Sequence, residues 1–206
     1  CGALWLFAFV VAWRYADDRK DAHLDAASLH ETGAALMSVF RDPLFLAICA
    51  LLTLWSFNPV WGSVLYLHMT EGLGFSERDF GNVTSAFFAG ALIGSIGYGI
   101  YCRSVRLSTL LHLSILAAIV SNAVYWQLGS LTSAYGISVL AGVAYMTGTL
   151  IQLDLTARII PARAAATVFA IVMALTNFAG SASEAFGGWL FEAAKTQGQG
   201  AFSLVV

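Results

Sequence analysis

The feature that most constrains this chain is the length of its segments without charged side chains. Leu107–Leu153 contains no Asp, Glu, Lys or Arg over 47 residues, and Ala164–Ser183 contains none over 20. About 20 apolar residues in a helix cross the hydrocarbon core of a bilayer, at about 1.5 Å per residue. The longer segment is right for two such helices, joined at the turn residues of Leu128–Ser133. We therefore expect helices that span a membrane.

The composition excludes several classes of protein. Hydrophobic residues make up 59% of the chain and charged residues only 11%, whereas soluble domains are about 25% charged. No segment combines basic and aromatic residues as nucleic-acid-binding surfaces do, so we expect no nucleic-acid partner. The three cysteines are isolated, which argues against a disulfide framework or a zinc site. The sequence indicates no cofactor, and the lipid bilayer is the expected partner.

Two further charge-free segments, Pro43–Thr70 and Phe80–Cys102, have the length of a membrane helix. Asp42 stands before the first of them as an N-cap stands before a proline in the first helical turn. Asn58-Pro59 lies in its middle, so we expect a kinked helix with free backbone carbonyls near Trp55. The tryptophans around this kink either line a cavity or serve packing alone.

Two motifs belong to the segment that follows. Ser76 and Asp79 have the spacing of a variant capping box at a helix start. Gly90 and Gly94 form a G-x-x-x-G, whose ordinary cause in membrane proteins is close contact with another helix.

The basic residues separate by side when the spans are alternated across a membrane. One side holds only Arg78 and Lys195, and the other holds Arg14, Arg19, Lys20, Arg41, Arg103, Arg106, Arg158 and Arg163. Cytoplasmic loops are enriched in Lys and Arg, so the polar segment Arg14–Asp42 is predicted to be cytoplasmic. We interpret this segment as a solvated connector, with a regulatory or partner-binding role as the alternative. The chain begins and stops inside apolar runs, so we interpret it as a fragment.

This layout resembles the second half of a major facilitator superfamily transporter. The resemblance implies the end of helix six at residues 1–13, a cytoplasmic central loop at 14–42, and a C-terminal bundle at 43–206 with helices seven to eleven and the start of twelve. The implied fold is all-α: a polytopic membrane helix bundle, the six-helix C-terminal half of a major facilitator-type fold, truncated at both ends. The missing N-terminal six-helix half of the same protein is then an expected partner.

Several motifs make the chain similar to the folate-biopterin transporter branch. They are Phe57-Asn-Pro59, Leu65-Tyr66, Thr70-Glu-Gly-Leu-Gly-Phe75, Gly97-Tyr-Gly-Ile-Tyr-Cys-Arg-Ser-Val-Arg106, Asp154-Leu-Thr-Ala-Arg158-Ile-Ile-Pro161, Ala166-Thr-Val-Phe-Ala170 and Leu175-Thr-Asn177. The chain departs from the superfamily between helices eight and nine. There the frequent Gly-x-x-x-Asp-Arg is replaced by a segment that holds Tyr98 and Tyr101 and no acid.

Polar and aromatic groups inside the spans are the candidates for a substrate cavity, because such groups are costly in a membrane and functional by default. They are Asn58, Trp61, Tyr145, Gln152, Asn177, Ser181 and Glu184. The last three fall at i, i+4 and i+7, so they share one helix face, which we expect to point inward. Glu184 is either a cavity acid that pairs with a proton or a cationic group, or a carboxylate that serves packing at the interface.

The candidates for gating or ion pairing lie near the predicted cytoplasmic ends of the spans: Asp154, Arg158, Arg103 and Arg106. Asp154 and Arg158 are spaced i,i+4 with the acid first, which is the favourable order for an ion pair on a helix. They either fix the helix end through a pair that breaks during gating, or handle a proton or substrate directly. His68 and His112 are both near span ends, where we expect interfacial packing.

The sequence and its resemblance together predict a secondary active transporter, a symporter for a small organic solute of folate or pterin type that works by alternating access. Proton coupling would run through Glu184 or an acid of the missing half. We expect an integral protein of the plasma or inner membrane. No catalytic triad, metal triad or phosphate loop is recognisable, so we do not expect an enzyme. The alternative is a non-transporting membrane sensor or assembly protein built on the same bundle.

Overall fold

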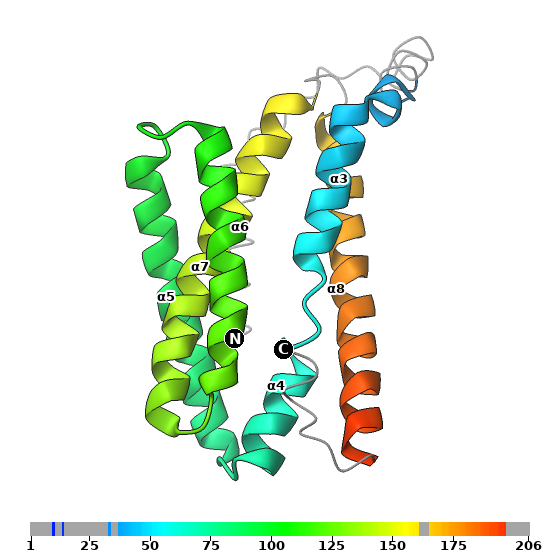
Figure 1. Ribbon diagram of the computed structural model, residues 1–206. Coiled ribbons are helices and arrows are strands. Elements are labelled where there is room, and N and C mark those ends of the chain that lie inside the picture. Colours follow the sequence, from blue (N-terminus) through cyan, green and yellow to red (C-terminus); the bar gives the residue numbers. More distant parts are fainter. Residues whose placement is uncertain (1–9, 11–13, 15–32, 34–36, 161–164, 197–206) are drawn as a thin grey trace.

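The computed structural model describes residues 37–160 and 165–196, together with the single positions 10, 14 and 33 (Figure 1). The predicted end of helix six at residues 1–13 and most of the predicted central loop at 14–42 lie outside this part of the chain. The elements that follow are α3 (Pro43–Ser56), α4 (Ser63–Leu67), the π-helical turn η1 (His68–Gly72), α5 (Glu77–Tyr101), α6 (Leu107–Val124), the 3₁₀ turn η2 (Tyr125–Gln127), α7 (Leu131–Ile159) and α8 (Ala165–Thr196).

The described part of the chain contains four helices that are long and apolar enough to cross a membrane. They cover Glu77–Tyr101, Leu107–Gln127, Leu131–Arg158 and Ala165–Lys195, and α3 is a shorter apolar helix. No strand occurs among the described residues. The predicted all-α, polytopic fold class is confirmed, and residues 128–130, the first half of the predicted turn at Leu128–Ser133, separate η2 from α7.

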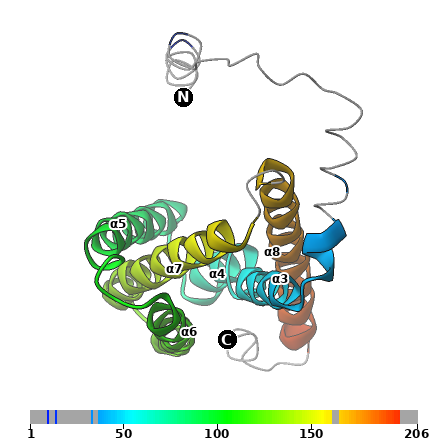
Figure 2. The same cartoon turned by 90° about the horizontal axis from the view of Figure 1, so that it is seen from above.

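The helices form two groups (Figure 2). In the first, α5 and α6 both pack against α7, and in the second, α3 packs against α8. The buried core of the second group joins Phe45, Ile48 and Leu52 of α3 to Val168 and Val172 of α8. The short helix α4 contacts α8 and so joins the lower part of the bundle to it. This arrangement decides which polar groups meet one another.

Glycines allow α5 and α7 to approach each other at backbone distance. A Cβ atom at Gly90 would overlap the carbonyl oxygen of Val139, and one at Gly94 would stand 2.8 Å from the carbonyl oxygen of Val143. Gly142 of α7 makes the equivalent contact from the other helix, because a Cβ atom there would overlap the carbonyl oxygen of Phe87. The close contact predicted from the G-x-x-x-G is therefore confirmed, and α7 is its partner.

The helix starts follow the capping rules that the sequence indicated. The carboxylate of Asp42 accepts a hydrogen bond from the amide of Leu44 at 2.9 Å, so the predicted N-cap before Pro43 is confirmed. Ser76 and Asp79 form the predicted capping box at the start of α5. A second capping box, made by Ser130 and Ser133, starts α7.

The first span departs from the prediction. We expected one kinked helix over Pro43–Thr70, but the helix ends at Ser56 and starts again only at Ser63. Pro59 has no N–H for the carbonyl of Trp55, so a break there is expected. The chain bends further than a kink because Gly62 adopts a left-handed backbone, with φ of 79°. The span is therefore discontinuous rather than kinked.

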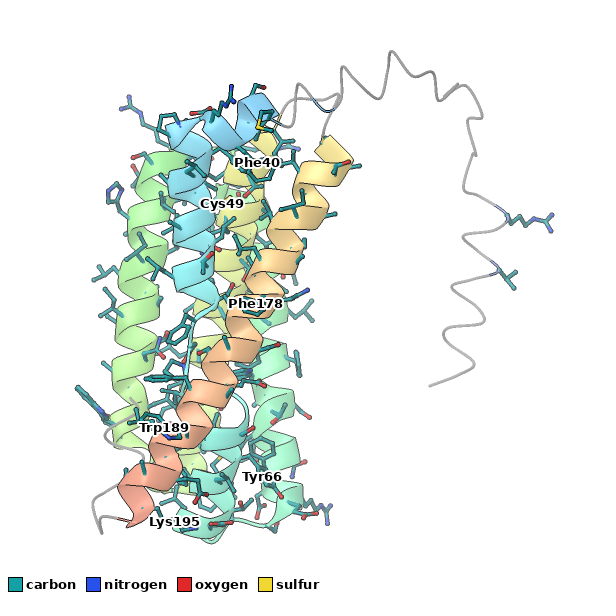
Figure 3. All side chains as sticks on the ribbon, turned by 90° about the vertical axis from the view of Figure 1, so that its right-hand side faces the viewer. Phe40, Cys49, Tyr66, Phe178, Trp189 and Lys195 are labelled. Atoms are coloured by element: carbon teal, nitrogen blue, oxygen red, sulfur yellow. The ribbon has the colours of Figure 1, made fainter. Side chains whose placement is uncertain are left out.

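Large apolar side chains cover the outer faces of the helices. Leu54, Ile100 and Phe178 are 73%, 74% and 72% exposed, and the ring of Trp189 also lies on the outside of α8 (Figure 3). Soluble proteins rarely expose apolar surface this continuous. The outer faces thus suit lipid rather than water.

Candidate functional site

The break in the first span, the segment Phe57–Gly62, contains two of the candidate residues, Asn58 and Trp61, and a third, Glu184, lies against it. Inside the break the backbone makes turn-type hydrogen bonds, from the amide of Asn58 to the carbonyl of Ser56 and from the amide of Trp61 to the carbonyl of Asn58. Irregular backbone at membrane depth is tolerated only where protein buries it or where it lines a water-filled cavity. The contacts around the segment show how this one is stabilised.

Asn58 ties the break to α6. Its side-chain amide donates to the side-chain carbonyl oxygen of Asn122 at 3.3 Å, and its own oxygen accepts from the amide of Val60 at 3.2 Å. The amide of Asn122 donates in turn to the carbonyl of Ala118 at 2.9 Å. All four polar side-chain atoms of this pair of amides are thus engaged inside the protein as donors or acceptors. Asn58 positions the backbone of the break.

Trp61 and Tyr145 share an aromatic cluster. The rings of Trp61 and Phe87 have centroids 4.3 Å apart, and those of Phe87 and Tyr145 have centroids 5.7 Å apart. Such pairs stabilise beyond the area that they bury. Trp61 is half-buried, whereas Tyr145 is 51% exposed. Trp61 thus packs on Phe87, and the role of Trp61 and Tyr145 in a substrate cavity stays a prediction.

Glu184 of α8 lies against the break. A Cβ atom at Gly62 would stand 2.6 Å from its Oε1, so glycine leaves the room that this carboxylate occupies. Gly187, one turn further along α8, approaches the carbonyl of Pro59 at backbone distance. Helix α8 therefore packs closely on the break at Gly187 and places the carboxylate of Glu184 beside Gly62. Glu184 is exposed in the described structure, so its carboxylate is accessible.

Asn177 and Ser181 are exposed on the same helix as Glu184. Ser181 follows the buried Val172 by nine residues, about two and a half turns, so it lies on the side of α8 opposite the contact with α3. Among the described residues, no hydrogen bond joins Asn177 or Ser181 to a candidate on another helix. The inward orientation that we expected for this face stays a prediction.

Gln152 of α7 lies deep in the bundle. It is 4% exposed, and its Nε2 has no hydrogen-bond partner among the described residues; the same holds for the hydroxyl of Ser183. One turn before Gln152, the indole of Trp55 packs directly on Gly148. Buried polar atoms without partners are costly, so these two are suited to hold a water molecule or to meet a group of a ligand.

A second polar cluster lies at the end of α7. Arg158 donates to both oxygens of Asp154, at 3.2 and 2.9 Å, so the predicted ion pair is present. The hydroxyl of Tyr98 donates to the same carboxylate at 3.3 Å, and that of Tyr101 donates to Thr147 at 3.4 Å. Tyr98 thus links α5 to α7 where the superfamily resemblance led us to expect an acid. Sequence analysis noted this tyrosine only as a departure.

The other two candidates for ion pairing do not join this cluster. Arg103 and Arg106 are exposed, and neither pairs with a carboxylate of any described residue. Their role as ion-pair partners stays a prediction.

A third polar contact, which sequence analysis missed, closes the opposite end of the bundle. Lys195 at the end of α8 donates to Glu71 of η1 at 2.7 Å. Figure 3 places Lys195 and Tyr66 at this end and Phe40 and Cys49 towards the other. Both charges are about half exposed, so the pair is readily broken. The opposite charges that flank the two spans were the available signal, but the residues are 124 positions apart.

These groups are of kinds that can bind and orient a solute. Within the described residues, no three His, Cys, Asp or Glu side chains converge as metal ligands. What the arrangement offers is a carboxylate beside irregular backbone, an exposed aromatic group, and breakable polar contacts at both ends of the bundle.

Comparisons with known proteins give one family. The sequence model of the Major Facilitator Superfamily matches residues 1–184. No curated protein and no solved structure matches the chain. The matched part includes the break, α5 to α7 and Glu184, and four helices of membrane length agree with it. The chain therefore belongs to the Major Facilitator Superfamily, a family of integral membrane transporters.

Proposed function

We propose that this chain forms one half of a secondary active transporter that moves a small organic solute by alternating access, with a folate- or pterin-like compound as the substrate class. The solute site in this proposal lies beside the break at Phe57–Gly62, and Glu184 is its acid. Proton coupling runs through the same carboxylate. The proposal makes the protein a symporter.

The observation that carries the proposal is the approach of Glu184 to Gly62. Broken helices supply the substrate and ion sites of many transporters, because their unwound backbone can face a cavity. A carboxylate inside a membrane span is costly in free energy, so such a group usually has a function. Here the acid and the unwound backbone occupy one place, and the acid remains accessible.

The neighbouring groups favour a flat, polar ring as substrate. Tyr145 presents an exposed aromatic ring next to Phe87 and Trp61, on which a planar heterocycle can stack. A carboxylate accepts two parallel N–H bonds, as the amino-pyrimidine edge of a pterin would supply. The partnerless Nε2 of Gln152 offers a further donor. This combination supports the substrate class that the sequence resemblance implies.

Polar contacts at both ends of the bundle support alternating access. The contact of Tyr98 with Asp154 and Arg158 lies at the predicted cytoplasmic end, and the Glu71–Lys195 pair lies at the other. Exposed ion pairs contribute little stability, typically about 0–1 kcal/mol, so they can break and re-form at a small cost in free energy. We propose that the two contacts alternate as gates.

The exposed polar face of α8 supports a second half as partner. Asn177 and Ser181 lie away from the described core, and such groups do not suit lipid. In our proposal this face meets the N-terminal six-helix half across the solute cavity.

Uptake of labelled folate and labelled pterin into cells that express the complete protein tests the proposal, with and without a proton uncoupler. Uptake that the uncoupler abolishes supports a proton-coupled carrier of this class. Uptake that resists the uncoupler contradicts the coupling. A complete protein at the cell surface that moves neither compound contradicts the substrate class, and failure in a broad solute screen favours a sensor or assembly protein.

A further inference from the structure

A cleft outside the proposed solute site runs between α6 and α7. Its volume is about 650 Å³, within the range of sites that hold small molecules. Ser114 and Ile151 are buried at its base, and Leu113 and Leu140 are about half exposed at its rim. Figures 1 and 2 show α6 and α7 side by side, and the lining residues Leu116 and Val120 of α6 are also about half exposed. The cleft therefore opens on an outer face.

The lining of the cleft is suited to hydrocarbon. Its hydroxyl groups are already engaged within the protein: Ser114 donates to the carbonyl of Leu111, Ser121 to that of Ala118, and Tyr101 to Thr147. The remaining lining side chains are aliphatic. A polar solute would lose its hydrogen bonds to water here without replacement. An acyl chain would lose none.

One end of the cleft carries positive charge. Tyr101 and Val105, which line it, belong to the end of α5 and to the connection into α6. Arg103 and Arg106 stand in the same connection, on either side of Val105. Both are exposed, and neither pairs with a carboxylate of the described residues. Unpaired basic residues at a membrane surface attract anionic lipid headgroups.

We propose that this cleft binds an anionic phospholipid, with an acyl chain between α6 and α7 and its headgroup phosphate on Arg103 and Arg106. The hydrocarbon lining accounts for the chain, and the two arginines account for the charge of the headgroup. Arginine pairs well with phosphate because its planar donors match the phosphate oxygens. The site is separate from Glu184 and does not depend on the solute.

Native mass spectrometry of the complete protein tests the site, with phosphatidylglycerol and phosphatidylcholine of identical acyl chains. We expect a preference of roughly 30-fold for phosphatidylglycerol, as two basic residues near a headgroup would give. The double variant Arg103→Gln/Arg106→Gln should bind the two lipids equally. Arg78→Gln, an exposed arginine at the other end of α5, is the charge control and should keep the preference.

A second variant tests the acyl-chain site. Ala117→Phe fills the cleft from α6 and should abolish retention of both lipids. Ala89→Phe on the exposed face of α5 is its matched control and should retain them. Equal binding of the two lipids by the unaltered protein overturns the proposal. Unchanged lipid retention in Ala117→Phe, together with a Tm that falls in every lipid, also overturns the proposal. Such a result would mean that a protein segment, and not a lipid, fills the cleft.

Discussion

The carboxylate of Glu184 lies where the side chain of any residue other than glycine at position 62 would begin. The 2.6 Å between Glu184 Oε1 and a Cβ built on Gly62 is shorter than real Cβ contacts. Two elements far apart in the chain thus fit each other: α8 carries Glu184 within an apolar stretch, and the break in the first span leaves room for its carboxylate. The proposed solute site rests on this match.

The substitution Gly62→Ala should distinguish the effect of Gly62 on stability from its effect on uptake. An alanine at the backbone angles of Gly62, φ of 79° and ψ of −121°, costs about 1–3 kcal/mol, and the flexible end of Glu184 can move away from the new methyl group. We therefore expect a modest loss of Tm and a large loss of uptake. Gly74→Ala is the matched control, because Gly74 has φ of 70° and no atom near its Cβ position. It should lose similar stability, measured by thermal unfolding in detergent, and keep its uptake.

Gly148→Ala tests how the two helix groups are joined. A methyl group there would overlap the indole of Trp55, and overpacking of this kind costs about 1–3 kcal/mol. Gly136→Ala on the same helix has open space around it and should be neutral or stabilising by up to about 1 kcal/mol. Thermal unfolding of both variants measures the difference. If the background substitution Trp55→Leu failed to reduce the cost at Gly148, the contact would not be its cause.

Tyr98→Phe removes the hydroxyl that links α5 to the Asp154 carboxylate. The bond is 3.3 Å long and half exposed, so we expect a cost near the lower end of the usual 0.5–1.5 kcal/mol. A double-mutant cycle with Asp154→Asn should show that the two changes are not additive. Tyr101→Phe, which loses only the contact with Thr147, should be additive with Asp154→Asn. Additivity of Tyr98→Phe would contradict the link.

Much of this fold was predictable because its determinants are local. Charge-free segments indicated the spans, Asp42 and Ser76 indicated two helix starts, and Gly90 marked the close contact of α5 with α7. Pro59 indicated a disturbance, but its size depends on Gly62 and on the seat that Gly187 provides on α8. No single segment carries that information.

The candidate site was predictable residue by residue but not as an assembly. Sequence reasoning chose Glu184 and Trp61 as polar or aromatic groups within spans, and it could not pair Glu184 with Gly62. The contacts of Tyr98 with Asp154 and of Lys195 with Glu71 join residues 56 and 124 positions apart. Such pairs form only when the helices pack against one another, so the sequence around either residue alone does not indicate them.

The side of the membrane on which Cys102 lies tests the predicted orientation. Cys102 stands beside Arg103 at the end of α5, and it is partly exposed. In a protein with Cys1→Ser and Cys49→Ser, a membrane-impermeant maleimide should modify it only from the cytoplasmic side. Labelling of intact and of inverted vesicles compares the two sides. Modification from outside would reverse the orientation of every span.

The most direct test of the central claim is the pH dependence of uptake by Glu184→Gln, with Glu192→Gln as control. Glu192 is an exposed acid on the same helix that contacts no part of the break among the described residues. The account predicts that Glu184→Gln abolishes the dependence of uptake on pH while Glu192→Gln preserves it. Unchanged pH dependence in Glu184→Gln, with the protein at its normal level in the membrane, would contradict the assignment of Glu184 as the coupling acid.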